Sequence, residues 1–357
     1  MGRLQIVRVG LLLVGVTAIA GAQTETGLPD NASATVAKQG EAAQRRLDEL
    51  RKMIERGKAP EALTELNTLA GQQPVPPGVE TLRGVAFYSQ NRFSEAEAAF
   101  ARSLKQNSRD EEATQLRGLA LFRLGRPTEA IPFLEAAHNW TRDTKTDPSY
   151  VLALCYIDTR RYDDARHSFA TQYGFAPDSA SAYLLAARML LRREYVPIAK
   201  EYAQKALELD PALPLAHALL GEIALAGEHL EEAIAEFEKE RARNPLEASS
   251  YDRLGDAYTR AGDYVRAQQA LQQAVLLEPN STGPYILLGK VYLKRQDPVS
   301  AAMYLERAEK MDPNNSITHV FLGQAYRQMG RTEDAKRQND LAQSLQSSNQ
   351  PRLDTMK

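Results

Sequence analysis

Apolar side chains return every three or four residues over most of the chain, which is the spacing of amphipathic helices and not of strands. Between residues 282 and 310, for example, Tyr285 and Leu288 fall on one face of a first helix, and Leu305 and Ala308 fall on one face of a second. Glycines, or prolines that follow an acidic residue, separate these runs and end helices. The pattern predicts an all-α chain of short paired helices.

The paired runs recur with a period of 34 residues. One unit carries Tyr251, Leu254, Gly255, Tyr258, Ala267, Leu271, Ala274 and Pro279, and the next carries Tyr285, Leu288, Gly289, Tyr292, Ala301, Leu305, Ala308 and Pro313. The pattern predicts units that start near residues 43, 77, 111, 146, 180, 214, 248, 282 and 316, with one slip of register by a single residue between 138 and 148. A fixed period of this length is the signature of a stacked repeat protein.

The pattern of an aromatic residue, Leu-Gly, Tyr, Ala, a large apolar residue, Ala and Pro resembles the tetratricopeptide repeat (TPR) family. The resemblance implies a right-handed superhelical solenoid of about nine helix–turn–helix units over residues 43–348, with no second domain. Small residues at the eighth and twentieth positions, such as Gly289 and Ala301, are expected to let the paired helices approach closely. Left-handed turns between paired helices are expected at Gly125, Gly227, Gly262 and Gly330.

The first 22 residues differ from the repeats. Arg3 and Arg8 precede an apolar run from Val9 to Ala20, which small residues follow, so we expect a cleavable signal peptide over 1–22 and an exported protein, periplasmic or extracellular. An uncleaved amphipathic start or a short anchor is the alternative. The run is shorter than the ~20 residues of a spanning helix, so no membrane span is expected after signal removal. Polar segments flank the repeats at 23–42, predicted to be a disordered leader, and at 349–357, predicted to be a tail.

Composition narrows the classes of function. The formal charge of −2 leaves no basic surplus of the kind that nucleic-acid binding needs, so no nucleic-acid partner is expected. The single cysteine, Cys155, excludes a disulfide within the chain and is expected to be a small buried side chain. No histidine pair has the spacing of a helical zinc site, and no phosphate-binding glycine motif occurs in the sequence. We therefore predict a protein that is not an enzyme and uses no metal or cofactor.

The family resemblance implies that first helices line a concave face, where ligands contact positions two, five, nine, twelve and thirteen of each unit. In the second to fifth units these positions carry apolar residues: Val85, Tyr88, Leu119, Phe122, Tyr150, Leu154, Ile157, Leu184 and Leu191. An exposed run of this size would exceed the apolar patch of an ordinary monomer. We predict a groove for an apolar peptide segment. The alternatives are that curvature buries part of the run or that it forms a homodimer surface.

In the sixth to ninth units the ligand positions are charged instead. Four cations could hold a carboxylate or a phosphate, or could be solvated charges beside Asp252 and Asp256: Arg260, Lys290, Lys294 and Arg327. The sequence as a whole predicts a non-catalytic scaffold or adaptor of the cell envelope that binds a peptide or another protein in its groove. A periplasmic scaffold of a polysaccharide-export or secretion assembly is the alternative.

Overall fold

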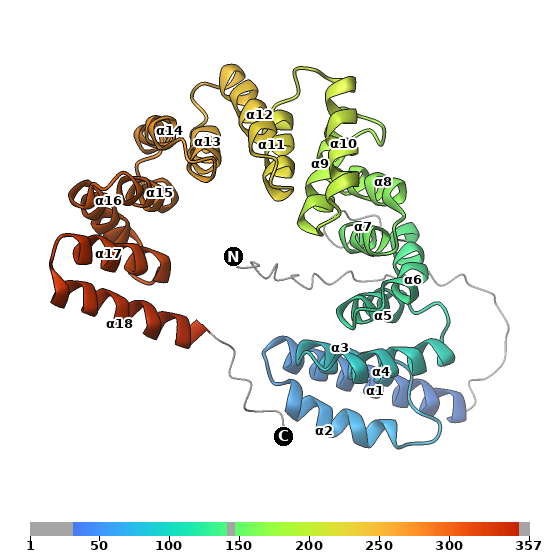
Figure 1. Cartoon of the computed structure of the whole chain (residues 1–357). Coiled ribbons are helices and arrows are strands. Elements are labelled where there is room, and N and C mark those ends of the chain that lie inside the picture. The colour runs from blue at the N-terminus through green and yellow to red at the C-terminus, as the bar shows by residue number, and fades with distance from the viewer. Residues whose placement is uncertain (1–30, 141–146, 350–357) are drawn as a thin grey trace. The chain divides into compact units, whose positions relative to one another are not determined.

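The computed structural model describes residues 31–140 and 147–349, and these residues form α-helices and no strand (Figure 1). They divide into two compact units, one that ends at Pro177 and one that begins at Asp178, which we call the N-terminal unit and the C-terminal unit. The predicted signal peptide, residues 1–22, lies outside the described residues, as does the tail from residue 350 onward. The all-α prediction is confirmed.

The N-terminal unit consists of helical hairpins, each made of a first and a second helix. Its helices are α1 (Asn31–Glu55), α2 (Ala59–Ala70), α3 (Val79–Ser89), α4 (Phe93–Gln106), α5 (Glu111–Arg123), α6 (Pro127–Trp140), α7 (Ser149–Asp158) and α8 (Tyr162–Tyr173). Helix α1 begins earlier than the predicted start near residue 43, inside the segment expected to be a disordered leader. No proline occurs between residues 31 and 55, and five alanines in the first half of this segment favour a helix.

The C-terminal unit continues the same pattern of hairpins. Its helices are α9 (Ala180–Arg192), α10 (Val196–Leu209), α11 (Ala216–Ala226), α12 (Leu230–Arg243), α13 (Ala248–Arg260), α14 (Tyr264–Leu277), α15 (Thr282–Lys294), α16 (Pro298–Met311), α17 (Ser316–Gln328) and α18 (Thr332–Asn349). Odd-numbered helices are the first helices and even-numbered helices the second helices of the hairpins in both units.

The turn inside each hairpin contains one residue with a left-handed backbone. Its φ angle lies between 58° and 80° at Gly57, Asn91, Gly125, Arg160, Glu194, Glu228, Gly262, Gln296 and Gly330. These positions are 34 residues apart except for one interval of 35 between Gly125 and Arg160, which confirms the period and the single slip of register. The expectation for Gly227 is wrong. Gly227 has a φ of −90° and ends α11, while Glu228, which stands at the repeat position of the turn, takes the left-handed conformation.

In several hairpins, close packing of the two helices depends on a glycine at the eighth repeat position. A Cβ atom on Gly289 would lie 2.3 Å from Cγ of Leu305, and one on Gly255 would lie 2.3 Å from Cγ of Leu271. Both distances are far below van der Waals contact, so the leucine of the second helix packs directly against the backbone of the first helix at a position where no other residue fits. The expected close approach at Gly289 is confirmed.

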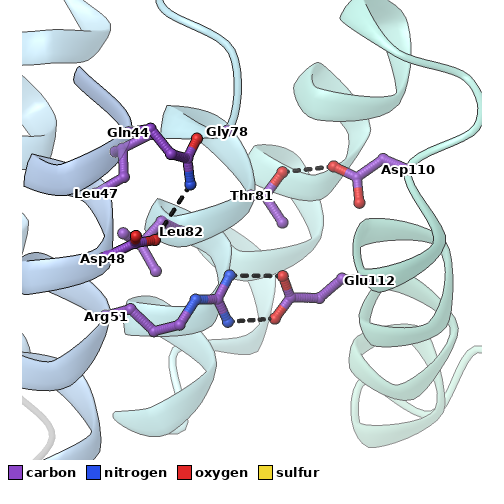
Figure 2. A pocket seen from close by; sticks show the side chains of 9 residues that line it. All are labelled: Gln44, Leu47, Asp48, Arg51, Gly78, Thr81, Leu82, Asp110 and Glu112. Atoms are coloured by element: carbon purple, nitrogen blue, oxygen red, sulfur yellow. Dashed lines mark hydrogen bonds and ion pairs between the residues drawn. The ribbon is translucent and has the colours of Figure 1, made fainter. Parts of the chain in front are cut away.

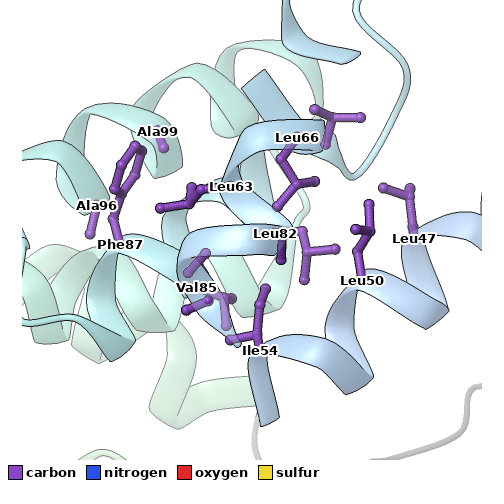
Figure 3. Close-up of a cluster of buried hydrophobic side chains, with 14 of the residues drawn as sticks. Leu47, Leu50, Ile54, Leu63, Leu66, Leu82, Val85, Phe87, Ala96 and Ala99 are labelled. Atoms are coloured by element: carbon purple, nitrogen blue, oxygen red, sulfur yellow. The ribbon is translucent and has the colours of Figure 1, made fainter. Parts of the chain in front are cut away.

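The core of the N-terminal unit is shared between successive hairpins (Figure 3). Leu50 of α1, Leu66 of α2 and Phe100 of α4 are fully buried, and Leu82 of α3 is 2% exposed. Burial of one such side chain contributes about 1.5–3 kcal/mol. Because the residues that bury one another come from different hairpins, each hairpin depends on its neighbour for its stability.

A recurring polar contact also joins successive hairpins. The hydroxyl groups of Tyr156, Tyr258 and Tyr326 donate hydrogen bonds to Glu135, Glu238 and Glu306 of the preceding hairpin, at 2.6, 2.9 and 2.9 Å. In each case an arginine guanidinium lies over the tyrosine ring, within 4.1–4.7 Å of its centroid. Burial and the neighbouring carboxylate raise the pKa of Tyr326 to about 12, so the phenol stays a donor at neutral pH.

Candidate peptide-binding surface

The first helices of successive hairpins contact one another and form one face of each unit. In the N-terminal unit α1 contacts α3, α3 contacts α5, and α5 contacts α7. In the C-terminal unit α13 contacts α15 and α15 contacts α17. We call these surfaces the first-helix faces of the two units. They carry the positions at which the sequence predicts ligand contacts.

The predicted apolar groove residues divide into two groups. Tyr88, Leu119, Phe122 and Leu154 are half-buried, and Tyr150 is 38% exposed, so these five side chains are in contact with solvent. They lie on α3, α5 and α7 and therefore belong to the first-helix face of the N-terminal unit.

The other predicted groove residues do not all reach this surface. Val85 is 7% exposed and Ile157 is fully buried, so neither side chain is available to a partner. This outcome matches the alternative in which part of the apolar run is internal. Leu184 and Leu191 are half-buried on α9 of the C-terminal unit, and Leu184 packs against the cluster that contains Leu213.

Aromatic contacts hold part of this face in place. The Tyr88 ring meets the edge of Phe93 with centroids 5.2 Å apart, and the guanidinium carbon of Arg123 lies 5.3 Å from the Phe93 centroid. Burial raises the pKa of the Tyr88 phenol, which keeps it neutral. Tyr150 similarly meets the edge of Phe169 of α8, at 5.8 Å. Rings positioned in this way lose little conformational entropy when a partner covers them.

A pair of charged residues that the sequence did not single out connects the first hairpin to the third. Arg51 of α1 donates two hydrogen bonds to the carboxylate of Glu112 of α5, at 2.6 and 2.7 Å, and crosses α3 on the way (Figure 2). These hydrogen bonds raise the pKa of Arg51. Arg51 stands at the ninth position of the first unit, and Glu112 stands at the second position of the third unit. Opposite charges at these two repeat positions are the only sign in the sequence that the two residues could pair.

The first-helix face of the C-terminal unit carries the four cations at which the sequence predicts anion contacts. Arg260 forms an ion pair with Asp256 at 2.8 Å, so its charge is already compensated. Lys290, Lys294 and Arg327 form no ion pair with another described residue. The structure therefore leaves three of the four predicted cations available to an anion.

Asp252 is an unusual carboxylate on this face. Its Oδ1 atom is buried and accepts no hydrogen bond from the described residues. Burial, together with the charges of Asp256 and Glu278, raises the pKa of Asp252 to about 6 against the opposing effect of Arg253. Arg253 is itself paired with Glu222.

The predicted structural side chains lie inside the repeats. Cys155 is buried, as expected. His319 is also fully buried, with Nε2 2.8 Å from the carbonyl oxygen of Pro313 and Nδ1 2.6 Å from Oε1 of Gln338.

Over residues 31–140 and 147–349, no three metal-ligating side chains gather in one place. In the same part of the chain, no helix combines the length and apolar character needed to cross a membrane.

Comparison with known families identifies the class of these hairpins. Models of the tetratricopeptide repeat match residues 54–106 and 81–143, residues 248–281, and residues 293–355. Together they cover slightly more than half of the chain, and the chain therefore belongs to the tetratricopeptide repeat family.

Individual relatives are distant. The chloroplastic tetratricopeptide repeat domain-containing protein PYG7 of Arabidopsis thaliana is 27% identical over 136 residues, which make up 37% of this chain and 45% of that protein. The matched region thus spans less than half of the relative's length.

Solved structures of similar fold include MamA of Desulfovibrio magneticus and YrrB, described as a TPR protein with an unusual peptide-binding site. MamA is 20% identical with a TM-score of 0.46, covering 49% of this chain and 98% of its own. YrrB is 23% identical with a TM-score of 0.42, covering 48% of this chain and 89% of its own. At these identities the likeness concerns the fold alone.

Proposed function

We propose that this protein is a non-catalytic adaptor that binds a peptide segment of another protein on the first-helix face of its N-terminal unit. The observation that carries the proposal is the row of solvent-contacting apolar side chains: Tyr88, Leu119, Phe122, Tyr150 and Leu154. Covering apolar surface releases about 25 cal/mol for each Å² removed from water. The helices that carry these side chains are already packed against their second helices, so binding requires little further ordering.

A displayed library of random 12-residue peptides tests this proposal. The purified protein is expected to enrich peptides with neighbouring apolar residues. The triple variant Leu119→Ser, Phe122→Ser, Leu154→Ser is expected to lose this enrichment. A matched variant, Leu276→Ser, Val299→Ser, Met303→Ser, changes three apolar side chains that are more than half exposed on second helices, and it should retain the enrichment.

Folding of the variants has to be checked because Leu119, Phe122 and Leu154 are half-buried. Circular dichroism melting curves provide that check. The single variant Tyr150→Ser, at the most exposed of the five positions, gives a second test with little risk to the fold. Unchanged peptide enrichment in both the triple and the single variant would show that the partner does not bind here.

We further propose that the protein is exported to the cell envelope. The supporting pattern is the pair Arg3 and Arg8 before the apolar run from Val9 to Ala20, with small residues at 20–22. Cell fractionation followed by mass measurement of the intact protein tests this location. A chain that begins near Gln23 in the envelope fraction is expected, whereas a cytosolic chain that retains residues 1–22 would refute export.

A further inference from the structure

A small hollow lies at the N-terminal end of the proposed binding surface. It has a volume of about 150 Å³ and is bounded by α1, by α3 and its preceding turn, and by the start of α5 (Figure 2). Sites for whole small molecules are usually about 300–1,000 Å³. The hollow is therefore too small for a typical free ligand and large enough for one side chain of a bound peptide.

The walls of the hollow are apolar on one side and acidic on the other. Leu47 and Leu82, which are 8% and 2% exposed, supply the apolar wall. Gly78 helps to keep the space open, because even a Cβ atom at this position would lie 3.3 Å from Cδ1 of Leu47. An apolar wall next to acidic groups matches the side chain of lysine or arginine, which has an aliphatic stem and a charged head.

The charges around the hollow leave a negative excess. Arg51 is bound by both carboxylate oxygens of Glu112, so this pair is formally neutral, and the charge of Asp48 also attracts Arg51. Asp110 accepts hydrogen bonds from the hydroxyl groups of Thr81 and Ser103, at 2.6 and 2.8 Å, and these donors carry no charge.

Asp48 adds a further carboxylate to the lining of the hollow. It accepts a hydrogen bond of 3.1 Å from the side-chain amide of Gln44, which is also a neutral donor. Of the four charged groups that line the hollow, three are carboxylates and one is a cation, so their formal sum is −2. Because Arg51 is occupied by Glu112, this charge pattern favours a cationic guest over an anionic one.

We propose that this hollow binds the lysine or arginine side chain of a peptide held on the first-helix face of the N-terminal unit. The aliphatic stem lies along Leu47 and Leu82, and the charged head lies between Asp48 and Asp110. This inference rests on the proposed function, because the hollow alone offers too little contact area to select a partner.

The geometry also sets the distance between the basic residue and the apolar residues of the peptide. Glu112 and Leu119 are separated by seven residues on α5, which corresponds to about 10 Å along the helix. An extended peptide rises about 3.3 Å per residue. A basic residue about three positions from an apolar residue is therefore expected in an extended guest, and about seven positions away in a helical one.

The test compares synthetic peptides from the display experiment by fluorescence anisotropy. The best enriched peptide that contains a lysine is made with this lysine intact and with norleucine in its place, which keeps the aliphatic stem and removes the charge. The protein is expected to bind the lysine peptide about tenfold more tightly at low salt, and this preference should fall with added salt.

Three variants locate the preference in the hollow. Asp48→Asn is expected to reduce the preference severalfold, and Gln44→Lys, which places the protein's own cation at the exposed edge of the hollow, is expected to abolish it. Glu61→Gln removes the same charge as Asp48→Asn from an exposed position on α2, outside the hollow, and should leave the preference unchanged.

The outcomes separate the two proposals. Equal affinity of the unmodified protein for the lysine and norleucine peptides would overturn the role of the hollow, even if both peptides depend on Leu119 and Phe122. An equal loss of the preference in Asp48→Asn and Glu61→Gln would also overturn it, since net charge alone would then explain the effect. Peptides that bind independently of Leu119, Phe122 and Leu154 would instead refute the proposed function.

Discussion

Replacing Gly289 with leucine tests the close approach of α15 and α16. The new Cβ atom would lie 2.3, 2.6 and 2.8 Å from the Cγ, Cδ2 and Cδ1 atoms of Leu305, which is fully buried. Overpacking of this kind costs about 1–3 kcal/mol, and a leucine, with three atoms beyond Cβ, should reach the upper end. The better helix propensity of leucine over glycine returns about 1 kcal/mol.

The net loss is therefore about 2 kcal/mol in the free energy of unfolding. For a unit of the size of the C-terminal one this corresponds to a decrease in Tm of about 4–8 °C. Circular dichroism melting provides the measurement. The matched control is Gly283→Leu on the same helix, where the Cβ atom would make only an ordinary contact of 3.7 Å with Asp252 and the rest of the side chain is at the surface.

A double variant tests the assignment of the clash to one pair of side chains. Leu305→Ala alone is expected to cost about 2–5 kcal/mol because it leaves a cavity. Combined with Gly289→Leu, it should cost at least 1 kcal/mol less than the sum of the two single changes, since the new leucine fills the cavity. Equal Tm values for Gly289→Leu and Gly283→Leu, or strictly additive effects in the double variant, would refute the proposed packing.

Three further predictions concern stability, each measured by urea unfolding. At the left-handed turn position Gly262→Ala should destabilise and Gln296→Gly should stabilise, each by about 1 kcal/mol, and changes of the same sign would contradict this. Because the pKa of folded Asp252 is raised to about 6, its charge costs nothing below pH 4 and up to about 3 kcal/mol above pH 6, so stability from this group falls as pH rises. Asp252→Asn should remove this decrease in the free energy of unfolding between pH 4 and pH 6. If the free energy of unfolding depends on pH in the same way in the variant and in the unmodified protein, the effect is excluded. Tyr326→Phe removes the hydrogen bond to Glu306 and should cost about 1 kcal/mol, and no change would show that the bond is not stabilising.

The sequence predicted the hairpins because each one repeats the same few packing constraints. Glycine at 262 and 330 indicates its own left-handed turn, since other residues rarely take that conformation. Glu228 and Gln296 take the same conformation without any local sign of it, because the two flanking helices impose the turn. That is why Gly227 was a misleading signal.

The binding surface was less predictable because exposure depends on neighbours and not only on repeat position. Val85 and Leu119 both stand at the ninth position, yet Val85 belongs to the buried core around α1 to α4 and Leu119 is half-exposed. The pair Arg51 and Glu112 is separated by 61 residues and meets only because three hairpins stack. A linear pattern gives the positions of such residues but not their distances.

The one interval of 35 residues shows where such a chain tolerates an extra residue. An insertion within a helix would turn the following side chains by about 100° and move the apolar stripe off its partner. Leu134 before the added residue and Leu152 after it are both buried in step with their own hairpins. The packing register is therefore kept on both sides of the added residue, and we expect changes in length to be tolerated between hairpins and not within their helices.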